Sequence, residues 1–267
     1  MPRLILCADD FAFSHGTSRT IVALAQAGKL NATGCMTALA DWPGDAAMLR
    51  DVPDHVEIGL HLTLTLEAPA IPMPELAPDG RLPPIGVLAA AARRRALPLE
   101  AVRRAVAAQF DRFAQAMGRP PAFVDAHQHA HVLPGIRAIV LAETAARAPS
   151  AWVRTCTDRP LAIAGRPFRG KALASAYHAS GLHRAAAAHG LACNAGFAGH
   201  YGFAGDYAAV FPAFLRHPGE RHLVMCHPGD GARDHDAIAA ARPIEAAALR
   251  ALPISDMAAA CGLSYPT

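Results

Sequence analysis

Short apolar runs alternate along the chain with longer segments in which apolar residues recur at helical spacing. The short runs predict strands at 4–8, 32–38, 56–66, 122–127, 151–156 and 222–226. The longer segments predict helices at 14–29, 45–49, 97–117, 134–147, 171–189, 207–215, 243–251 and 255–261, the first of them with Ser14 as its N-cap. Strands that alternate with helices are typical of a parallel sheet with helices on its outside.

The length and punctuation of the chain favour one domain. It has 267 residues, and neither an internal repeat nor a linker divides it. We therefore expect a single α/β domain over 1–267, a distorted (β/α) barrel of parallel strands with outer helices. Residues 67–84 contain six of the 22 prolines and predict a loop. A loop of this length in a compact domain tends to form a lid or wall of a site.

The composition excludes several classes of protein. Hydrophobic residues make up 52% of the chain and the formal net charge is +3, which excludes a disordered chain. The basic charge is nearly all arginine and is spread along the sequence, so we expect no nucleic-acid partner. No apolar stretch approaches the roughly 20 residues that span a bilayer, and the first residues do not resemble a signal peptide. The six cysteines are scattered, so we expect reduced thiols, a cytoplasmic location and no membrane insertion.

One regularity of the sequence indicates where the site lies. Polar side chains occur at or near the carboxyl ends of successive predicted strands: Asp9 and Asp10, His61, Asp125 and His127, Arg154, and His227. In parallel α/β folds these ends converge on one rim of the sheet, where active sites lie. Three of the 14 histidines fall within 127–131, which makes a metal site the first candidate.

Asp9 and Asp10 follow the first apolar strand directly. Neighbouring side chains of an extended strand point to opposite faces, so one carboxylate can bind a metal while the other stands beside it as a general base. The alternative is a helix cap or a plain strand end. His61 lies among leucines within 58–65. In the company of the other strand-end groups it is a candidate metal ligand rather than an ordinary core histidine.

The segment 125–131, DAHQHAH, leaves two geometries open. In an extended strand, Asp125, His127 and His129 would share a face. In a helical turn, His127 and His131 would be neighbours able to bind one ion. Asp125 is alternatively a residue that orients a ligating histidine. We take His127 as the first candidate ligand and leave the roles of His129 and His131 open.

His227 precedes a Pro-Gly turn at the end of a predicted strand. A histidine held there suits a general acid that protonates a leaving amine, and the alternative is a turn histidine that bonds to the backbone. A nucleophilic serine elbow, a P-loop and a dinucleotide-binding glycine motif are all missing from suitable sequence contexts. Mechanisms based on a nucleophilic serine or a nucleotide cofactor therefore have no support.

All of these residues except Arg154 lie in four motifs by which the sequence resembles the YdjC family of carbohydrate deacetylases. The motifs are CADDF at 7–11, IGLHLT at 58–63, VDAHQHAH at 124–131 and MCHPG at 225–229, and they stand in the family's order over nearly the whole chain. The sequence departs from the family at Ala12, where glycine usually follows DDF, and at 194–205, which matches loosely.

The resemblance implies a fold like that of the NodB-type polysaccharide deacetylases, with one divalent cation, Zn or Mg, bound by Asp10, His61 and His127. It further implies that Asp9 is the general base, that His227 is the general acid, and that Arg154 keeps Asp9 charged and oriented. The implied reaction removes the N-acetyl group from an amino sugar or short oligosaccharide and releases acetate. Similar proteins suggest a homodimer.

Two alternatives remain at this point. The first is a metal hydrolase of the same fold that acts on a non-sugar amide or ester. The second is a non-catalytic barrel that binds only sugar or metal. The presence of both Asp9 and His227 argues against the second, because binding alone requires neither.

Overall fold

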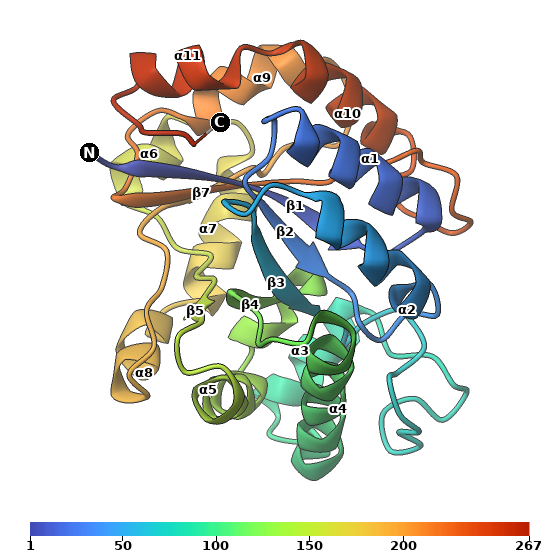
Figure 1. The fold of residues 1–267 in the computed structure, drawn as a ribbon. Helices are drawn as coiled ribbons and strands as arrows, with labels where there is room; N and C mark the ends of the chain where they lie inside the picture. Colours follow the sequence, from blue (N-terminus) through green and yellow to red (C-terminus); the bar gives the residue numbers. More distant parts are fainter. Residues whose placement is uncertain (267) are drawn as a thin grey trace.

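The structure, a computed structural model, describes residues 1–266. Within this range, seven strands form one sheet in the order β5-β4-β3-β2-β1-β7-β6, and all neighbours are parallel. They are β1 (Arg3–Phe11), β2 (Ala32–Cys35), β3 (Glu57–Leu62), β4 (Phe123–Ala126), β5 (Trp152–Val153), β6 (Phe197–Ala198) and β7 (Arg221–Cys226). The predicted fold class is confirmed: the strands form a curled half-barrel with helices around it (Figure 1).

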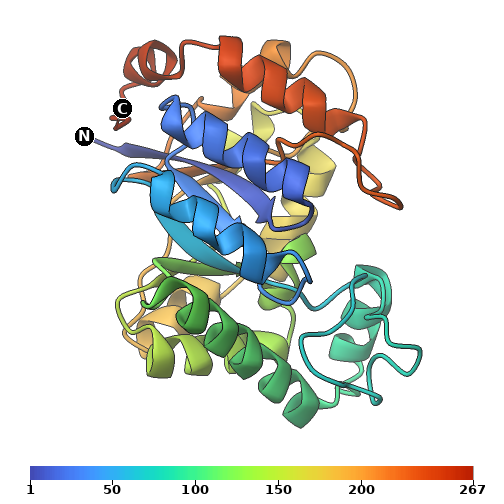
Figure 2. The ribbon, with the colours of Figure 1, turned by 45° about the vertical axis from the view of Figure 1, so that its right-hand side comes forward.

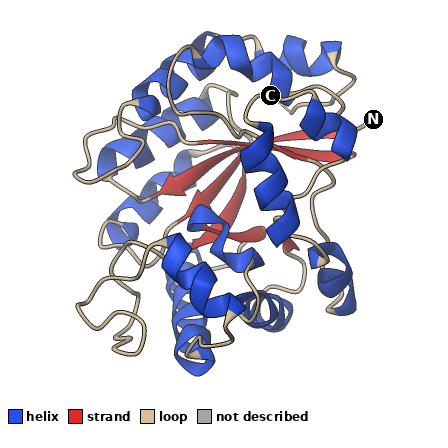
Figure 3. Cartoon of the chain, turned by 180° about the vertical axis from the view of Figure 1, so that it is seen from behind, coloured by secondary structure: helices blue, strands red, loops and turns tan. Residues whose placement is uncertain are grey.

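Helices cover the outside of the sheet, as Figure 3 shows from behind. In chain order they are α1 (His15–Gln26), α2 (Trp42–Asp45), η1 (Ala46–Asp51), α3 (Ile85–Arg93), α4 (Leu99–Met117), η2 (His127–Val132), α5 (Ile136–Arg147), α6 (Pro160–Ala164), α7 (Arg169–His178), α8 (Leu182–Ala188), α9 (Tyr207–Phe214), α10 (Ala241–Ala251) and α11 (Ile254–Ala260). The last three helices lie over the β1–β7 side, and α3 to α5 lie near β3 and β4 (Figure 1).

The packing around β1 shows that the sheet is curled. Ile5 and Cys7 belong to one buried cluster together with Trp152 of β5 and Phe197 of β6. Because β5 and β6 stand at opposite ends of the strand order, they share a core only if the sheet curves round. Side chains alternate along a strand, so Asp9 continues the inward row of Ile5 and Cys7. The Sγ of Cys7 lies 3.6 Å from Oδ1 of Asp9, in agreement with this placement.

Local signals in the sequence set several helix ends. Ser14 is the N-cap of α1, as predicted, and its side chain accepts a hydrogen bond from the backbone amide of Thr17. Asp206 caps α9 in the same way. Gly118 ends α4 with a φ of 65°, the left-handed conformation that favours glycine at this position.

Some predicted elements differ from the observed ones. The helix predicted at 171–189 is two helices, α7 and α8, because Gly181 adopts a φ of 77° between them. β1 continues beyond the predicted end at residue 8, and the glycine-rich segment at 194–206 contains the short strand β6. Residues 67–84 form the predicted loop, which projects at the lower right of Figure 2.

Two features of residues 1–266 relate to the expectations from composition. None of the helices within residues 1–266 is long and apolar enough to cross a membrane. All six cysteines are free thiols, and four of them are buried. Burial raises the pKa of Cys7 well above its usual value, which keeps this thiol protonated.

Candidate active site and metal centre

β1 ends in a strained turn that carries the two adjacent carboxylates. Its register against β2 shifts between residues 8 and 11, so Asp9 and Asp10 lie in a β-bulge, and such bulges re-aim side chains next to active sites. Asp10 and Ala12 both have a φ of 68°, in the left-handed region that favours glycine. This conformation explains why glycine would suit the position of Ala12, where the resemblance to the YdjC family implies glycine. The Oγ of Ser18 accepts a hydrogen bond from the amide of Ala12 at 2.9 Å and holds the turn.

β3 and β4 place His61 beside Asp125. The two residues are register partners, and Nδ1 of His61 lies 2.6 Å from Oδ1 of Asp125. When the imidazole is neutral, a carboxylate in this position accepts the Nδ1 proton, which fixes the tautomer and leaves Nε2 unprotonated. This Nε2 lies 3.3 Å from Oδ1 of Asp10. Asp125 is therefore placed to orient the imidazole of His61, one of the roles that the sequence left open for this residue.

His127 follows β4 and is turned towards Asp10. Its Nδ1 lies 3.0 Å from Oδ1 of Asp10. The next two residues, Gln128 and His129, have φ values of 52° and 59°. The backbone is therefore neither an extended strand nor a regular helical turn, and both geometries considered for 125–131 were wrong. Left-handed residues of this kind cluster at functional sites, where the surrounding structure holds them.

The other two histidines of this segment point elsewhere. The ring of His129 packs edge-on against His200, with 5.9 Å between the ring centroids. Nε2 of His131 donates to the backbone carbonyl of Arg154 at 2.8 Å, and the His131 side chain is buried. Of the three histidines within 127–131, only His127 reaches Asp10.

Asp10, His61 and His127 form a group that could hold a metal ion. One potential ligand atom from each lies within 4.8 Å of the others, and Asp10 and His61 are buried. One carboxylate and two imidazoles are ligands that zinc and related divalent metals accept, with coordination positions left open. Within residues 1–266 a second group with similar spacing consists of Asp9, His61 and Asp125.

Ion pairs favour the first of these groups. Both carboxylate oxygens of Asp9 accept hydrogen bonds from Arg154, at 2.7 and 2.6 Å. Oδ2 of Asp125 lies 2.6 Å from the same guanidinium, and its Oδ1 faces His61. A metal ion bound to Asp9 and Asp125 would therefore lie against the positive charge of Arg154. In Asp10, by contrast, Oδ1 is turned towards the two imidazoles.

Arg154 keeps Asp9 ionised. Burial alone would raise the pKa of the Asp9 carboxyl, but the charge and hydrogen bonds of Arg154 outweigh it and lower this pKa below its usual value. The guanidinium is completely buried, so solvent screens this pairing little. The family resemblance implies that Arg154 keeps Asp9 charged and oriented, and the structure places the guanidinium against both carboxylate oxygens of Asp9.

His227 follows β7 and lies beside Asp9. Its Nε2 is 3.9 Å from Oδ2 of Asp9. Its backbone amide donates to Oε2 of Glu245 at 2.5 Å, and its Nδ1 is 3.9 Å from Oε1 of that residue. Burial lowers the pKa of His227 to about 4 and raises the pKa of Glu245 to about 7. Near neutral pH, a carboxyl that carries a proton part of the time thus lies beside a neutral imidazole.

Two charged residues of this site, Arg242 and Glu245, were not predicted from the sequence. Nη2 of Arg242 lies 2.9 Å from Oδ2 of Asp10, the oxygen that faces away from the imidazoles. Both residues are on α10, three positions apart and buried at 1% and 0% exposure. They occupy the buried stripe that Leu249 continues. No sequence signal identified them, because a charged residue of an amphipathic helix ordinarily lies on its solvated face.

The charges around His61 favour its protonated form when no metal is bound. Burial would lower the pKa of this imidazole, but the carboxylates of Asp125 and Asp9 outweigh it and raise the pKa to about 10. A proton on His61 therefore adds positive charge to this buried group of carboxylates, besides the charges of Arg154 and Arg242. A metal ion would have to displace that proton.

The sequence matches the family model described as "YdjC-like protein" over residues 3–259. Among curated relatives, the chitooligosaccharide deacetylase of Enterobacter sp. (strain 638) is 36% identical over 144 residues, which are 54% of this chain and 56% of that one. The chitooligosaccharide deacetylase of Proteus mirabilis is 34% identical over 137 residues, 51% of this chain and 53% of that one. The match thus spans about half the length of each of these relatives.

A solved structure supports the fold. An Enterococcus faecalis V583 protein, named for cellobiose-phosphate cleavage, superposes with a TM-score of 0.73 and covers 100% of this chain and 97% of its own. The two sequences are 18% identical. This similarity shows a shared fold and says nothing further about chemistry.

Proposed function

We propose that this chain, which belongs to the YdjC-like protein family, is a divalent-metal-dependent carbohydrate deacetylase. The observation that carries the proposal is one compact arrangement of side chains. Asp10, His61 and His127 have ligand atoms within 4.8 Å of one another, and Asp9 and His227 lie beside them. Curated relatives named chitooligosaccharide deacetylases support the same reaction.

The donor set fits a divalent cation. Asp10 would offer Oδ1, with His61 and His127 as the two imidazole ligands. Asp125 would hold the tautomer of His61, and Arg242 would hold the second oxygen of Asp10. A divalent cation bound here, Zn or Mg, would acidify a water molecule and polarise the acetamide carbonyl.

Asp9 and His227 would move the protons. Asp9, ionised by Arg154, would accept a proton from the water that attacks the acetamide carbon. His227 would donate a proton to the departing amine, so that acetate and a free amino sugar leave. Nε2 of His227 and Oδ2 of Asp9 are 3.9 Å apart, beyond hydrogen-bond distance. For the proton taken from water to pass to the imidazole and then to the amine, the two groups would have to move closer or be bridged by a water molecule.

Glu245 would support the acid in this step. With a pKa of about 4, His227 is neutral at pH 7 until a negative charge develops nearby. Charge on the attacked carbonyl oxygen would raise that pKa during the reaction. Glu245 faces Nδ1 of His227 and would stabilise the imidazolium as it forms.

The substrate would be an N-acetylated amino sugar or a short oligosaccharide. The alternative is a non-sugar amide or ester cleaved by the same groups. We further propose that the protein works in the cytoplasm, in line with its free thiols, and that it forms a homodimer, as the family resemblance implies.

The test combines acetate release with metal analysis of the purified protein. Substrates are N-acetylglucosamine, its oligomers, a simple acetamide and an aryl acetate. Variant His61→Ala is compared with His189→Ala, an exposed histidine away from the site. We expect metal content and acetate release to fall together in His61→Ala and to be unchanged in His189→Ala.

Other results would contradict specific parts of the proposal. Acetate release from the acetamide or aryl acetate but not from any sugar would favour the alternative substrate class. Metal binding without hydrolysis of any substrate would indicate a binding protein. Full activity in metal-free His61→Ala would remove the ion from the mechanism.

A further inference from the structure

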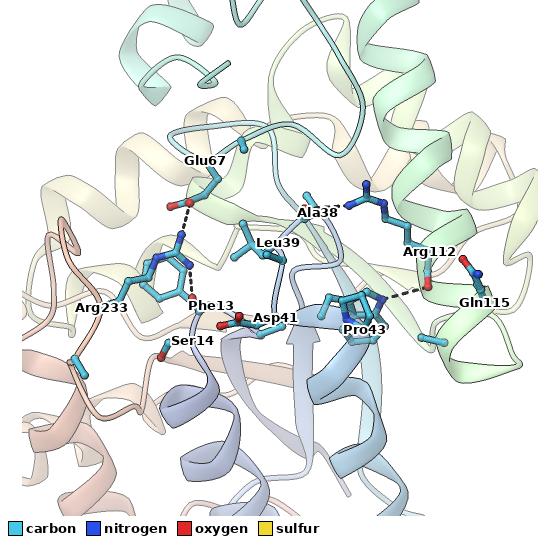
Figure 4. A pocket seen from close by; sticks show the side chains of 16 residues that line it. Phe13, Ser14, Ala38, Leu39, Asp41, Pro43, Glu67, Arg112, Gln115 and Arg233 are labelled. Atoms are coloured by element: carbon cyan, nitrogen blue, oxygen red, sulfur yellow. Dashed lines mark hydrogen bonds and ion pairs between the residues drawn. The ribbon is translucent and has the colours of Figure 1, made fainter. Parts of the chain in front are cut away.

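A large groove lies beside the candidate metal centre and takes no part in it. Its volume is about 970 Å³, near the upper end of the roughly 300–1,000 Å³ of pockets that bury a drug-sized ligand. Figure 4 shows Phe13, Glu67 and Arg233 at one end, Asp41 and Leu39 in the middle, and Pro43, Arg112 and Gln115 at the other end. None of the three candidate metal ligands lines it.

Phe13 connects the groove with the metal centre. Its ring lines the groove and is also stacked on His127, with 6.4 Å between the ring centroids and 26° between their planes. The chain reaches this ring three residues after Asp10, through the strained turn at the end of β1. A molecule bound at the metal centre and one bound in the groove would therefore meet at Phe13.

The charged side chains of the groove are largely satisfied by the protein. Arg233 pairs with Glu67 and lies over the Phe13 ring, 4.1 Å from its centroid. Arg112 donates to the backbone carbonyls of Ala38 and Ala70 and so ties α4 to the two loops of the groove. With Asp41, the lining carries two carboxylates and two guanidinium groups, so its formal charges cancel. The lining therefore has no net formal charge that would attract a strongly charged ligand.

Two polar groups of the lining are free to bind. Asp41 and Gln115 are exposed, and within residues 1–266 neither side chain makes a hydrogen bond or an ion pair. A carboxylate accepts hydrogen bonds, and an amide both donates and accepts them. Pro43 lies between them and offers an exposed apolar surface (Figure 4). An uncharged molecule with many hydroxyl groups and apolar faces, such as a glycan, matches this lining.

We propose that the groove binds the sugar units of an oligosaccharide that lie beyond the acetylated unit at the metal centre. This inference rests on the proposed function and adds a location to it: Asp41 and Gln115 select substrate length. The volume exceeds the needs of a single sugar ring. Phe13, which is 5% exposed, stands between the groove and His127, so the sugar chain would pass around this ring from one site to the other.

The experiment blocks the groove without touching the metal centre. Ala40 is an exposed residue of its lining, and Ala40→Trp would obstruct part of it. Ala47→Trp is the matched control, because Ala47 is exposed and lies outside the lining. The double variant Asp41→Ala/Gln115→Ala removes the free polar groups without adding bulk. We measure kcat/KM for N-acetylglucosamine and for its dimer, trimer and tetramer.

We expect the ratio of kcat/KM for the trimer to that for the monomer to fall about tenfold in Ala40→Trp, the equivalent of about 1.4 kcal/mol. The double variant should lower the ratio in the same direction, and Ala47→Trp should leave it unchanged. Equal ratios in the wild-type protein and both groove variants would overturn the proposal. So would a wild-type protein that does not prefer the oligomers.

A binding measurement separates failure of this proposal from failure of the proposed function. If the wild-type protein releases no acetate from any sugar, the proposed function fails, and the groove is tested by calorimetric titration with the N-acetylglucosamine tetramer. Binding that is lost in Ala40→Trp and kept in Ala47→Trp would support a glycan groove on its own. No binding to the wild-type protein, or equal binding to Ala40→Trp, would overturn it.

Discussion

Metal binding at this site should be strongly pH-dependent because of His61. In the metal-free protein, the carboxylates of Asp125 and Asp9 raise the pKa of His61 to about 10 despite its burial. A metal ion binds the neutral imidazole, so it must displace one proton at neutral pH. The test is to measure metal binding at pH values between 6.5 and 8.5, in the wild-type protein and in Asp125→Asn.

The expected size follows from the distance between the pH and this pKa. At pH 7, about three units below this pKa, only about one His61 side chain in 10³ is unprotonated. The apparent metal affinity is therefore weakened by about 10³, or about 4 kcal/mol. The apparent affinity should rise about tenfold for each pH unit over the range studied. Asp125→Asn removes the carboxylate that contributes most to the raised pKa, so its pH dependence should be shallower.

Competition with a chelator of known affinity measures zinc binding at each pH. Calorimetry in buffers of different ionisation enthalpy then counts the protons released. We expect about one proton per ion near pH 7 in the wild-type protein. An affinity that does not change with pH, together with no proton release, would refute the assignment of His61 as a protonated residue whose proton the metal displaces.

The stability of the metal-free protein provides a control with the opposite sign. Because the folded pKa of His61 is raised, its contribution to stability is complete below about pH 6.5, its ordinary pKa, and is lost as the pH rises towards about 10. Thermal melts of the metal-free protein should therefore show a falling Tm between pH 7 and pH 9. With saturating zinc, the Tm should fall less or rise over the same interval.

Three substitutions test the remaining roles. Asp9→Asn should keep its metal and lose about 10² to 10⁴ in turnover, as for a general base; metal loss in proportion to activity would mean that Asp9 is a ligand. Arg242→Gln should weaken metal binding about 10- to 100-fold, because it removes the group that holds Oδ2 of Asp10, and unchanged affinity in the chelator assay would contradict this. His227→Ala should lose about 10² to 10⁴ in turnover on an N-acetyl sugar and much less on an activated aryl acetate, whose leaving group needs no proton. Equal losses on both substrates would exclude His227 as the acid.

The sequence could indicate which residues lie close together at the rim, because the carboxyl ends of parallel strands lie at the same edge of the sheet. Asp10, His61 and His127 come at the ends of β1, β3 and β4, and the common direction of these strands brings them together. The strand order was not predictable from the sequence. β2 lies between β1 and β3, so Asp10 reaches His61 across the end of a strand that contributes no ligand.

The contacts supplied by α10 were beyond sequence reasoning for a different physical reason. A charged residue in an amphipathic helix is ordinarily on the solvated face. The burial of Arg242 and Glu245 depends on where α10 docks over the rim, which is a property of the tertiary fold. The bulge at Asp10 and the left-handed backbone of Gln128 and His129 likewise depend on tertiary contacts that no local pattern records.

The balance of buried charge around Asp10 gives an independent reason to expect a divalent rather than a monovalent ion. Apart from Glu245 and the histidines that also contact it, the connected group contains the carboxylates of Asp9, Asp10, Asp125 and Asp236 and the guanidinium groups of Arg154 and Arg242. Four negative charges against two positive charges leave an excess of two. Buried charge without a partner is costly, so this excess requires compensation. The proton on His61 neutralises half of it, and a divalent ion that replaces this proton neutralises all of it, whereas a monovalent ion would gain nothing over the proton it displaces.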